Sequence, residues 1–253
     1  MISGYGKLIK VIKDERGFSI LHMADEKGKN VFSEEFAEEL ITALDDLSQN
    51  QKPRVVILKG LPDVFAGGGD KRVLEGLAEG KVSVKDLIIS DKLLASPFPI
   101  IAAMEGHAVG GGLMLACCCD IVLASLESRY GAVFMSMGFT PGMGCTTLLA
   151  ELVGNFTAHE MMYTAKRFKG RELKERGTAI NYILPKALVM PKATDIALQI
   201  AEKNPKSVYL LKRTLVARKK RLLIEARLQE DLMHEISFSF PETKSILKEY
   251  YVE

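Results

Sequence analysis

Apolar residues recur with two different periods in the first part of the chain. The apolar stretches LIKVI and FSILHM lie on either side of the polar residues DERG, which predicts a hairpin of two strands. The period then changes to that of a helix over residues 33–47. The apolar positions of this helix are Phe36, Leu40, Leu44 and Leu47. Ser33 can cap it, and the glutamates that follow suit its positive N-terminal end.

Three short, continuous apolar runs come next, each suited to a buried strand. They are VVILKG at 55–60, PIIAAMEG at 99–106 and DIVLAS at 120–125. The stretch LMLACCCD between the last two is typical of a helix, and residues 70–96 are mixed, which indicates a mobile loop and a helix. Strands that alternate with helices predict parallel βαβ units and an α/β fold.

Beyond about residue 150 the pattern is mostly helical. We therefore predict an α/β core over residues 1–190 and a helical region over 191–253 that packs on the core or on a neighbouring subunit. The N-terminus shows no signal peptide, and no run reaches the roughly 18 apolar residues of a membrane span. We expect a cytoplasmic protein that does not insert into a membrane.

Charge and cysteine content narrow the possible functions. The formal net charge of the 253 residues is only +2, which argues against a nucleic-acid binder, although a local basic patch remains compatible with it. Cys117, Cys118 and Cys119 are consecutive and Cys145 stands apart, so neither disulfides nor a C-x-x-C metal site are expected. Buried small side chains in a helix are the simpler interpretation.

Two glycine clusters carry the first indication of chemistry. Gly67, Gly68 and Gly69 follow one predicted strand, and 110–112 are glycines after another. Two such turns can direct two backbone N–H groups at one oxygen, which is how an oxyanion hole is built. A phosphate site and a plain tight turn are alternatives, but neither a G-x-G-x-x-G dinucleotide motif nor a G-x-x-x-x-G-K-[ST] motif is present.

Three ordered motifs extend this indication. FAGGGD at 65–70 is similar to the F-x-A-G-A-D turn of the crotonase (enoyl-CoA hydratase/isomerase) superfamily. PIIAAMEGHAVGGGLMLACCCDIVLAS at 99–125 resembles the strand–turn–helix–strand signature of that family. GFTPGMGCT at 138–146 matches its G-x-x-P-G-x-G-x-T segment. Nearly the whole chain thus resembles a crotonase.

The resemblance implies a fold, an assembly and a site. The fold would be α/β of the ClpP/crotonase type, a β-spiral of βαβ units with a C-terminal helical trimerisation region. The assembly would be a homotrimer or a dimer of trimers. The oxyanion hole would be formed by the backbone N–H groups of Gly69 and Gly111.

The two glutamates that family hydratases use for acid–base work are missing. Met114 stands three residues after the second oxyanion glycine, and Phe134 stands four residues before Gly138 of the G-x-x-P-G-x-G segment. By the resemblance, both side chains would line the substrate pocket. Such a pocket keeps the device that stabilises an enolate but lacks the carboxylates for adding water. Decarboxylation fits, because departing CO2 leaves its electrons behind to form the enolate.

A narrower resemblance points the same way. YGAVFMSMGFTPGMG at 130–144 and EDLMHEISF at 230–238 look like the decarboxylating crotonase homologues of polyketide β-branching cassettes. Those enzymes convert 3-methylglutaconyl on an acyl carrier protein into 3-methylcrotonyl. The resemblance gives His234, in its E-x-x-x-H-x-x-x-F setting, an active-site role. Without it, a satisfied or surface histidine on a terminal helix is the simpler interpretation.

A lysine near the mobile loop holds the carboxylate of the substrate in these relatives. Lys81 and Lys85 are the two candidates here, and Lys71 also lies in the loop. We expect the partner to be an acyl carrier protein that carries acyl-phosphopantetheine, with no metal, cofactor or nucleic acid. The basic run at 218–221 is either a solvated helical face or a contact for phosphates.

Other interpretations remain open. The chain could be an enoyl-CoA isomerase or hydratase-like enzyme that acts on CoA esters. It could also be a catalytically silent crotonase used as a scaffold or as an RNA-binding protein. We interpret His22, His107 and His159 as structural, although His107 lies close enough to the second glycine turn to shape it.

Overall fold

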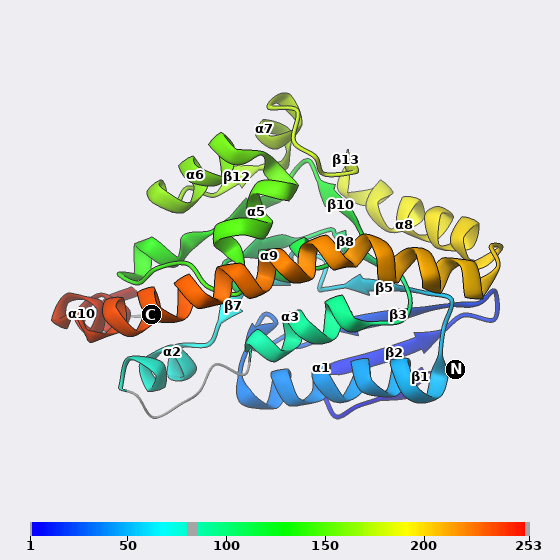
Figure 1. Ribbon diagram of the computed structural model, residues 1–253, viewed down its shortest axis with the longest axis horizontal. Coiled ribbons are helices and arrows are strands. Elements are labelled where there is room, and N and C mark those ends of the chain that lie inside the picture. The colour runs from blue at the N-terminus through cyan, green and yellow to red at the C-terminus, as the bar shows by residue number, and fades with distance from the viewer. Residues whose placement is uncertain (1, 80–85, 251–253) are drawn as a thin grey trace.

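The main sheet of the protein has seven strands. The computed structural model describes residues 2–79 and 86–250 (Figure 1). The order in the sheet is β1-β2-β3-β5-β8-β10-β13, with β1 to β3 antiparallel and β3 to β13 parallel. The strands are β1 (Ile2–Gly4), β2 (Ile9–Lys13), β3 (Phe18–Met23), β5 (Val55–Lys59), β8 (Ile100–Met104), β10 (Ile121–Ser125) and β13 (Tyr182–Leu184). The predicted hairpin and the three predicted buried strands are confirmed.

Short strands form a second layer that carries the glycine turns. A four-stranded sheet has the order β12-β11-β9-β6, and β4 pairs with β7. These strands are β4 (Val31–Phe32), β6 (Val64–Ala66), β7 (Gly68–Gly69), β9 (His107–Val109), β11 (Arg129–Gly131) and β12 (Phe168–Lys169). Each of β5, β8 and β10 is followed by one short strand of this sheet, so the chain winds through both sheets in turn. This is the predicted crotonase-type spiral of βαβ units.

Helices cover the sheets on both sides. They are α1 (Glu34–Asp46), α2 (Lys71–Ala78), α3 (Asp86–Ala95), α4 (Gly111–Cys117), α5 (Cys145–Val153), α6 (Asn155–Thr164), α7 (Gly170–Glu175), α8 (Lys186–Ala201), α9 (Pro205–Ser239) and α10 (Pro241–Tyr250). A π-helical turn (Leu47–Gln51) extends α1, and a 3-10 helix, η2 (Val133–Met137), follows β11. Ser33 caps α1 as predicted, because its Oγ accepts the N–H of Phe36 at 3.2 Å. None of the described helices is long and apolar enough to cross a membrane.

The predicted boundary between residues 190 and 191 falls inside α8. This helix packs on β5, β8 and β10, and Val189, Ala193 and Ala197 are fully buried against the sheet. A hydrophobic contact of this kind ties α8 to the core. The next helix, α9, runs along the long axis of the molecule to α10 (Figure 1).

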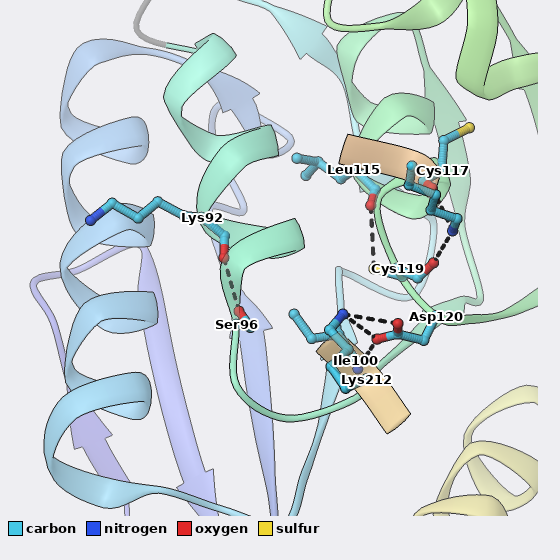
Figure 2. A network of polar contacts seen from close by, with 9 residues as sticks. Lys92, Ser96, Ile100, Leu115, Cys117, Cys119, Asp120 and Lys212 are labelled. Carbon is cyan, nitrogen blue, oxygen red and sulfur yellow. Dashed lines mark hydrogen bonds and ion pairs between the residues drawn. The ribbon is translucent and has the colours of Figure 1, made fainter. Parts of the chain in front are cut away.

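Two lysines fasten the first half of α9 to the core, and Figure 2 shows one of them, Lys212, beside Asp120 and Ile100. The side chain of Lys212 is 1% exposed, and its Nζ donates to both carboxylate oxygens of Asp120 at 2.9 and 2.7 Å. Asp120 also accepts the N–H of Ile100 at 2.8 Å. Lys219 donates from Nζ to the carbonyl oxygens of Cys117, at 2.9 Å, and Cys119. A cation at these carbonyls suits the negative C-terminal end of α4.

Candidate active site

A cavity of about 280 Å³ opens where the glycine turns meet the end of α9. Its wall combines backbone from the glycine turns, aromatic side chains and four basic side chains. The residues that line it are Lys29, Val31, Phe32, Val64, Gly67, Gly68, Gly69, Leu74, Leu77, His107, Val109, Gly110, Gly111, Val133, Phe134, Met137, Phe139, Gly142, Met143, Arg167, His234 and Phe238. No Asp or Glu occurs among these described lining residues.

The two glycine turns lie against each other at this cavity. Gly68 has φ +88°, and a Cβ there would lie 2.7 Å from the carbonyl oxygen of Val109 and 3.4 Å from the N of Gly111. Gly110 also has a positive φ of +54°. Glycine is required at Gly68 because any side chain would separate the turns and would be strained at this φ.

Both predicted oxyanion residues reach the cavity wall. Gly69 ends β7, where it pairs with Phe32. Gly111 begins α4, and the first N–H groups of a helix have no partner within it. A Cβ on Gly111 would lie 2.7 Å from Cε2 of Phe32 and 2.8 Å from Sδ of Met143, so that position is closely covered. The structure therefore brings together the two backbone segments that an oxyanion hole needs.

His234 joins the cavity from the far half of α9. Its Nε2 lies 2.8 Å from the carbonyl oxygen of Thr140. Since a carbonyl oxygen accepts, Nε2 carries the hydrogen, and Nδ1 holds the lone pair of the neutral ring. The ring packs edge-on against Phe139 and Phe238, with centroids 6.1 and 5.5 Å apart.

The surroundings favour the neutral imidazole. Burial lowers the pKa of His234, and the bond to Thr140 and the charges of Glu230 and Asp231 oppose this shift. A further anion placed beside the ring would raise the pKa of His234. The residue is therefore suited to gaining a proton when an anionic group binds next to it.

Aromatic rings close the cavity on the side of η2. Phe134 lines it and lies edge-on to Phe139, whose ring stacks on Phe238 at 4.7 Å. Met114, the other residue expected in the substrate pocket, is not among the residues that line this cavity. It is fully buried in the core, because every residue of α4 is buried and only Gly111 at its start reaches the cavity.

Several lining residues were not predicted from the sequence. Leu74 and Leu77 come from α2, in a stretch expected to hold a mobile loop and a helix. Phe238 is the last residue of the E-x-x-x-H-x-x-x-F pattern, so the pattern contained a signal for it. Phe139 follows the Gly138 that opens the G-x-x-P-G-x-G motif, but nothing in its spacing indicated a pocket.

Lys81 and Lys85, the predicted carboxylate-binding lysines, lie outside the described residues. Lys71 begins α2 and does not line the cavity. The basic groups that do so, besides His234, are Lys29, His107 and Arg167. Lys29 forms an ion pair with Asp63 at 3.5 Å.

The other histidines have local roles. Nδ1 of His107 accepts the N–H of Arg129 at 2.9 Å, and burial, followed by the charge of Arg129, lowers the pKa of His107. Burial also lowers the pKa of His22, and His159 contacts the ring of Tyr163. Within residues 2–79 and 86–250, no group of three or more His, Cys, Asp or Glu side chains could hold a metal ion.

A comparison with protein families identifies this arrangement. The model of the enoyl-CoA hydratase/isomerase family matches residues 14–253. The chain belongs to this family. The glycine turns, the spiral of short and long strands and the helical C-terminus are those of a crotonase.

Similar crotonases include decarboxylases. The chain is 37% identical over 244 residues to the bacillaene synthase decarboxylase PksI of Bacillus subtilis, covering 96% of this chain and 98% of the relative. A solved structure described as a dehydratase/decarboxylase enzyme couple involved in polyketide β-branching matches with a TM-score of 0.93 and 35% identity, over 99% of this chain and all of the other. The ECH2 decarboxylase domain of CurF from Lyngbya majuscula matches with a TM-score of 0.90 and 35% identity, over 96% and 99% of the two chains.

Proposed function

We propose that this crotonase decarboxylates a 3-methylglutaconyl-type thioester carried by an acyl carrier protein, giving 3-methylcrotonyl during polyketide β-branching. The similarity to PksI and to the CurF decarboxylase domain supports the reaction class. The observation that carries the proposal is the composition of the cavity. It combines two glycine backbone turns with His234 and aromatic walls, and no carboxylate lies among its described lining residues.

The bond changes follow from this composition. The thioester oxygen would accept N–H groups of Gly69 and Gly111 as the bond between the γ carbon and the carboxylate breaks. The electron pair of that bond forms the dienolate, and CO2 leaves. One donor of an oxyanion hole is worth about 3 kcal/mol of transition-state stabilisation. The apolar side chains of Phe134 and Phe139 favour neutral CO2 over a hydrated carboxylate.

In this proposal His234 binds the carboxylate of the substrate and later supplies the proton that the γ carbon gains. The substrate anion would raise the depressed pKa of His234, and the protonated ring would pair with it. Once CO2 has left, the ring would give its proton to the γ carbon, which restores the α,β double bond. Lys81 or Lys85 would be a second cation for the carboxylate.

We further propose that the phosphopantetheine arm enters the cavity past basic side chains. Lys29, His107 and Arg167 line the cavity and suit the phosphodiester of a carrier protein. We propose no cofactor and a cytoplasmic location. A homotrimer or a dimer of trimers would cover the apolar side chains that α9 exposes, which are Tyr209, Leu210, Leu211, Leu215, Ile224, Leu228, Leu232 and Ile236.

Intact-protein mass spectrometry tests the proposal. The carrier protein loaded with 3-methylglutaconyl is mixed with native enzyme, with His234→Ala or with the matched control His159→Ala, whose histidine does not line the cavity. We expect the loss of one CO2 with the native enzyme and the control, and a rate at least about 100-fold lower with His234→Ala.

Two results would count against the proposal. If the loaded carrier keeps its mass beside folded native enzyme, the decarboxylase assignment fails. Turnover of CoA esters alone would then indicate the isomerase or hydratase-like alternative, and salt-sensitive RNA binding without turnover would indicate the scaffold. If His234→Ala matches the control, the histidine has no part in the reaction.

A further inference from the structure

Glu230 is a buried carboxylate on α9, one helical turn before His234. It is 1% exposed and does not line the cavity. Oε2 accepts the N–H of Gly144 at 2.7 Å, and Oε1 accepts both the N–H and the hydroxyl of Thr146, at 2.8 and 2.7 Å. A buried carboxylate needs such donors, since an unpaired one would be very costly.

The donors stand at the start of α5. Gly144 is the N-cap residue of that helix and supplies no capping side chain of its own. Glu230 therefore caps α5 from another helix, with its negative charge at the positive helix end. The backbone that it holds is strained at Met143, which has φ +62° although it is not a glycine, and the φ of +82° at Gly144 suits glycine.

The same backbone touches both halves of the cavity. We call residues 140–146 the capped segment. Its Thr140 carbonyl accepts the hydrogen of Nε2 of His234. A Cβ on Gly142 would lie 2.3 Å from Cε1 of that ring, so the segment passes directly along the imidazole. Met143 covers Gly111, where a Cβ would lie 2.8 Å from its Sδ.

We propose that Glu230 is a positioning residue for the decarboxylation, which holds the capped segment so that His234 and Gly111 keep a fixed separation. This inference rests on the proposed function. Glu230 acts through the segment, whereas the substrate touches the ring and the glycine turns. Small displacements of groups that face a reacting atom reduce turnover more than they reduce binding.

The charge of Glu230 has a second effect on the imidazole. Together with Asp231, it opposes the lowering of the pKa of His234 that burial causes. Other charged or titratable groups lie around the same ring. Glu79, Glu235 and Lys244 line a neighbouring hollow together with His234, from the end of α2, from α9 and from α10. Lys29, His107 and Arg167 line the main cavity with it.

Two variants separate position from charge. Glu230→Gln keeps the shape but removes the charge, and its amide group faces N–H donors. Thr146→Val removes one hydrogen bond and leaves the charge in place. We expect kcat for CO2 release to fall about tenfold in Glu230→Gln and less in Thr146→Val, with KM within about twofold of native in both.

The pH dependence distinguishes this role from general support of the fold. In Glu230→Gln the titration of His234, followed by NMR of the imidazole, is expected at lower pH than in the native protein. In Thr146→Val it is expected at the native pH. This readout needs no turnover, so it also tests the inference if the decarboxylase assignment fails.

Either of two results overturns the inference. One is native kcat and native His234 titration in folded Glu230→Gln. The other is a fall in kcat matched by an equal fall in substrate-analogue affinity, because that indicates a collapsed cavity. If Glu230→Gln does not fold, Thr146→Val decides, since a lower kcat at native KM supports the inference and an unchanged kcat refutes it.

Discussion

Replacing Gly68 with alanine is expected to abolish most activity by separating the two glycine turns. The new Cβ would lie 2.7 Å from the carbonyl oxygen of Val109, which is backbone and cannot rotate away. The positive φ of +88° adds about 1–2 kcal/mol of strain for a residue with a side chain. A shift of a few tenths of an ångström would then move Gly69 relative to Gly111.

The size of the effect follows from the loss of one aligned donor. Removing an oxyanion donor lowers kcat by about 10²–10³. We expect a decrease near the lower end, about 100-fold, because the N–H remains present but displaced. The assay is the rate of CO2 loss from the loaded carrier protein, measured by intact mass at saturating substrate.

Gly154→Ala is the matched control for backbone strain. Gly154 has φ +83°, close to that of Gly68, but nothing lies within 4 Å of a Cβ placed there. Both variants should lower the melting temperature, Gly154→Ala through backbone strain of about 1–3 kcal/mol and Gly68→Ala through strain together with the contact to Val109. Only Gly68→Ala should lose activity. A folded Gly68→Ala with kcat within about threefold of the control would refute the assignment of the turns as an oxyanion hole.

Three further predictions concern groups away from the turns. Lys212→Met should lower the free energy of unfolding in urea by about 3–5 kcal/mol, because it leaves Asp120 without its buried partner; a change below about 1 kcal/mol would contradict this. The depressed pKa of His234 means that stability is fully present above the unfolded pKa of about 6.5 and is lost as pH falls through the lower native value. The fall in unfolding free energy between pH 7 and pH 5 should therefore be smaller in His234→Leu than in the native protein, and an equal fall would refute the linkage. The four cysteines are buried and burial raises their pKa values, so a thiol reagent should label them only after unfolding, and rapid labelling of the native protein would contradict that burial.

Local patterns predicted the long elements because each long element buries its own apolar residues. The helix at 33–47 shows its period within a single window, and VVILKG shows a continuous apolar run within one. The short strands β9 and β11 were missed, since three residues are too few to show a period. Their pairing depends on contacts made across the second sheet.

The candidate site likewise contains residues that the sequence could indicate and residues that it could not. The glycine turns could be predicted because glycine marks positions where backbone must approach backbone. His234 became a candidate only through the resemblance, and so did Met114, which does not line the cavity described here. The contacts of Glu230 join residues 84 and 86 positions apart, so no local pattern could show them.

The hydrogen bonds of Lys219 fix the rotation of α9 about its own axis. They therefore also fix the direction in which the later side chains of this helix point. Lys219 is bonded to the end of α4, and the same uninterrupted helix presents His234 to the cavity at which α4 begins. One residue inserted between Lys219 and His234 would turn the imidazole by about 100° around the helix and move it about 1.5 Å along the axis. Side chains in this stretch can be exchanged, but its length cannot change by one residue without turning the imidazole away from the carbonyl of Thr140.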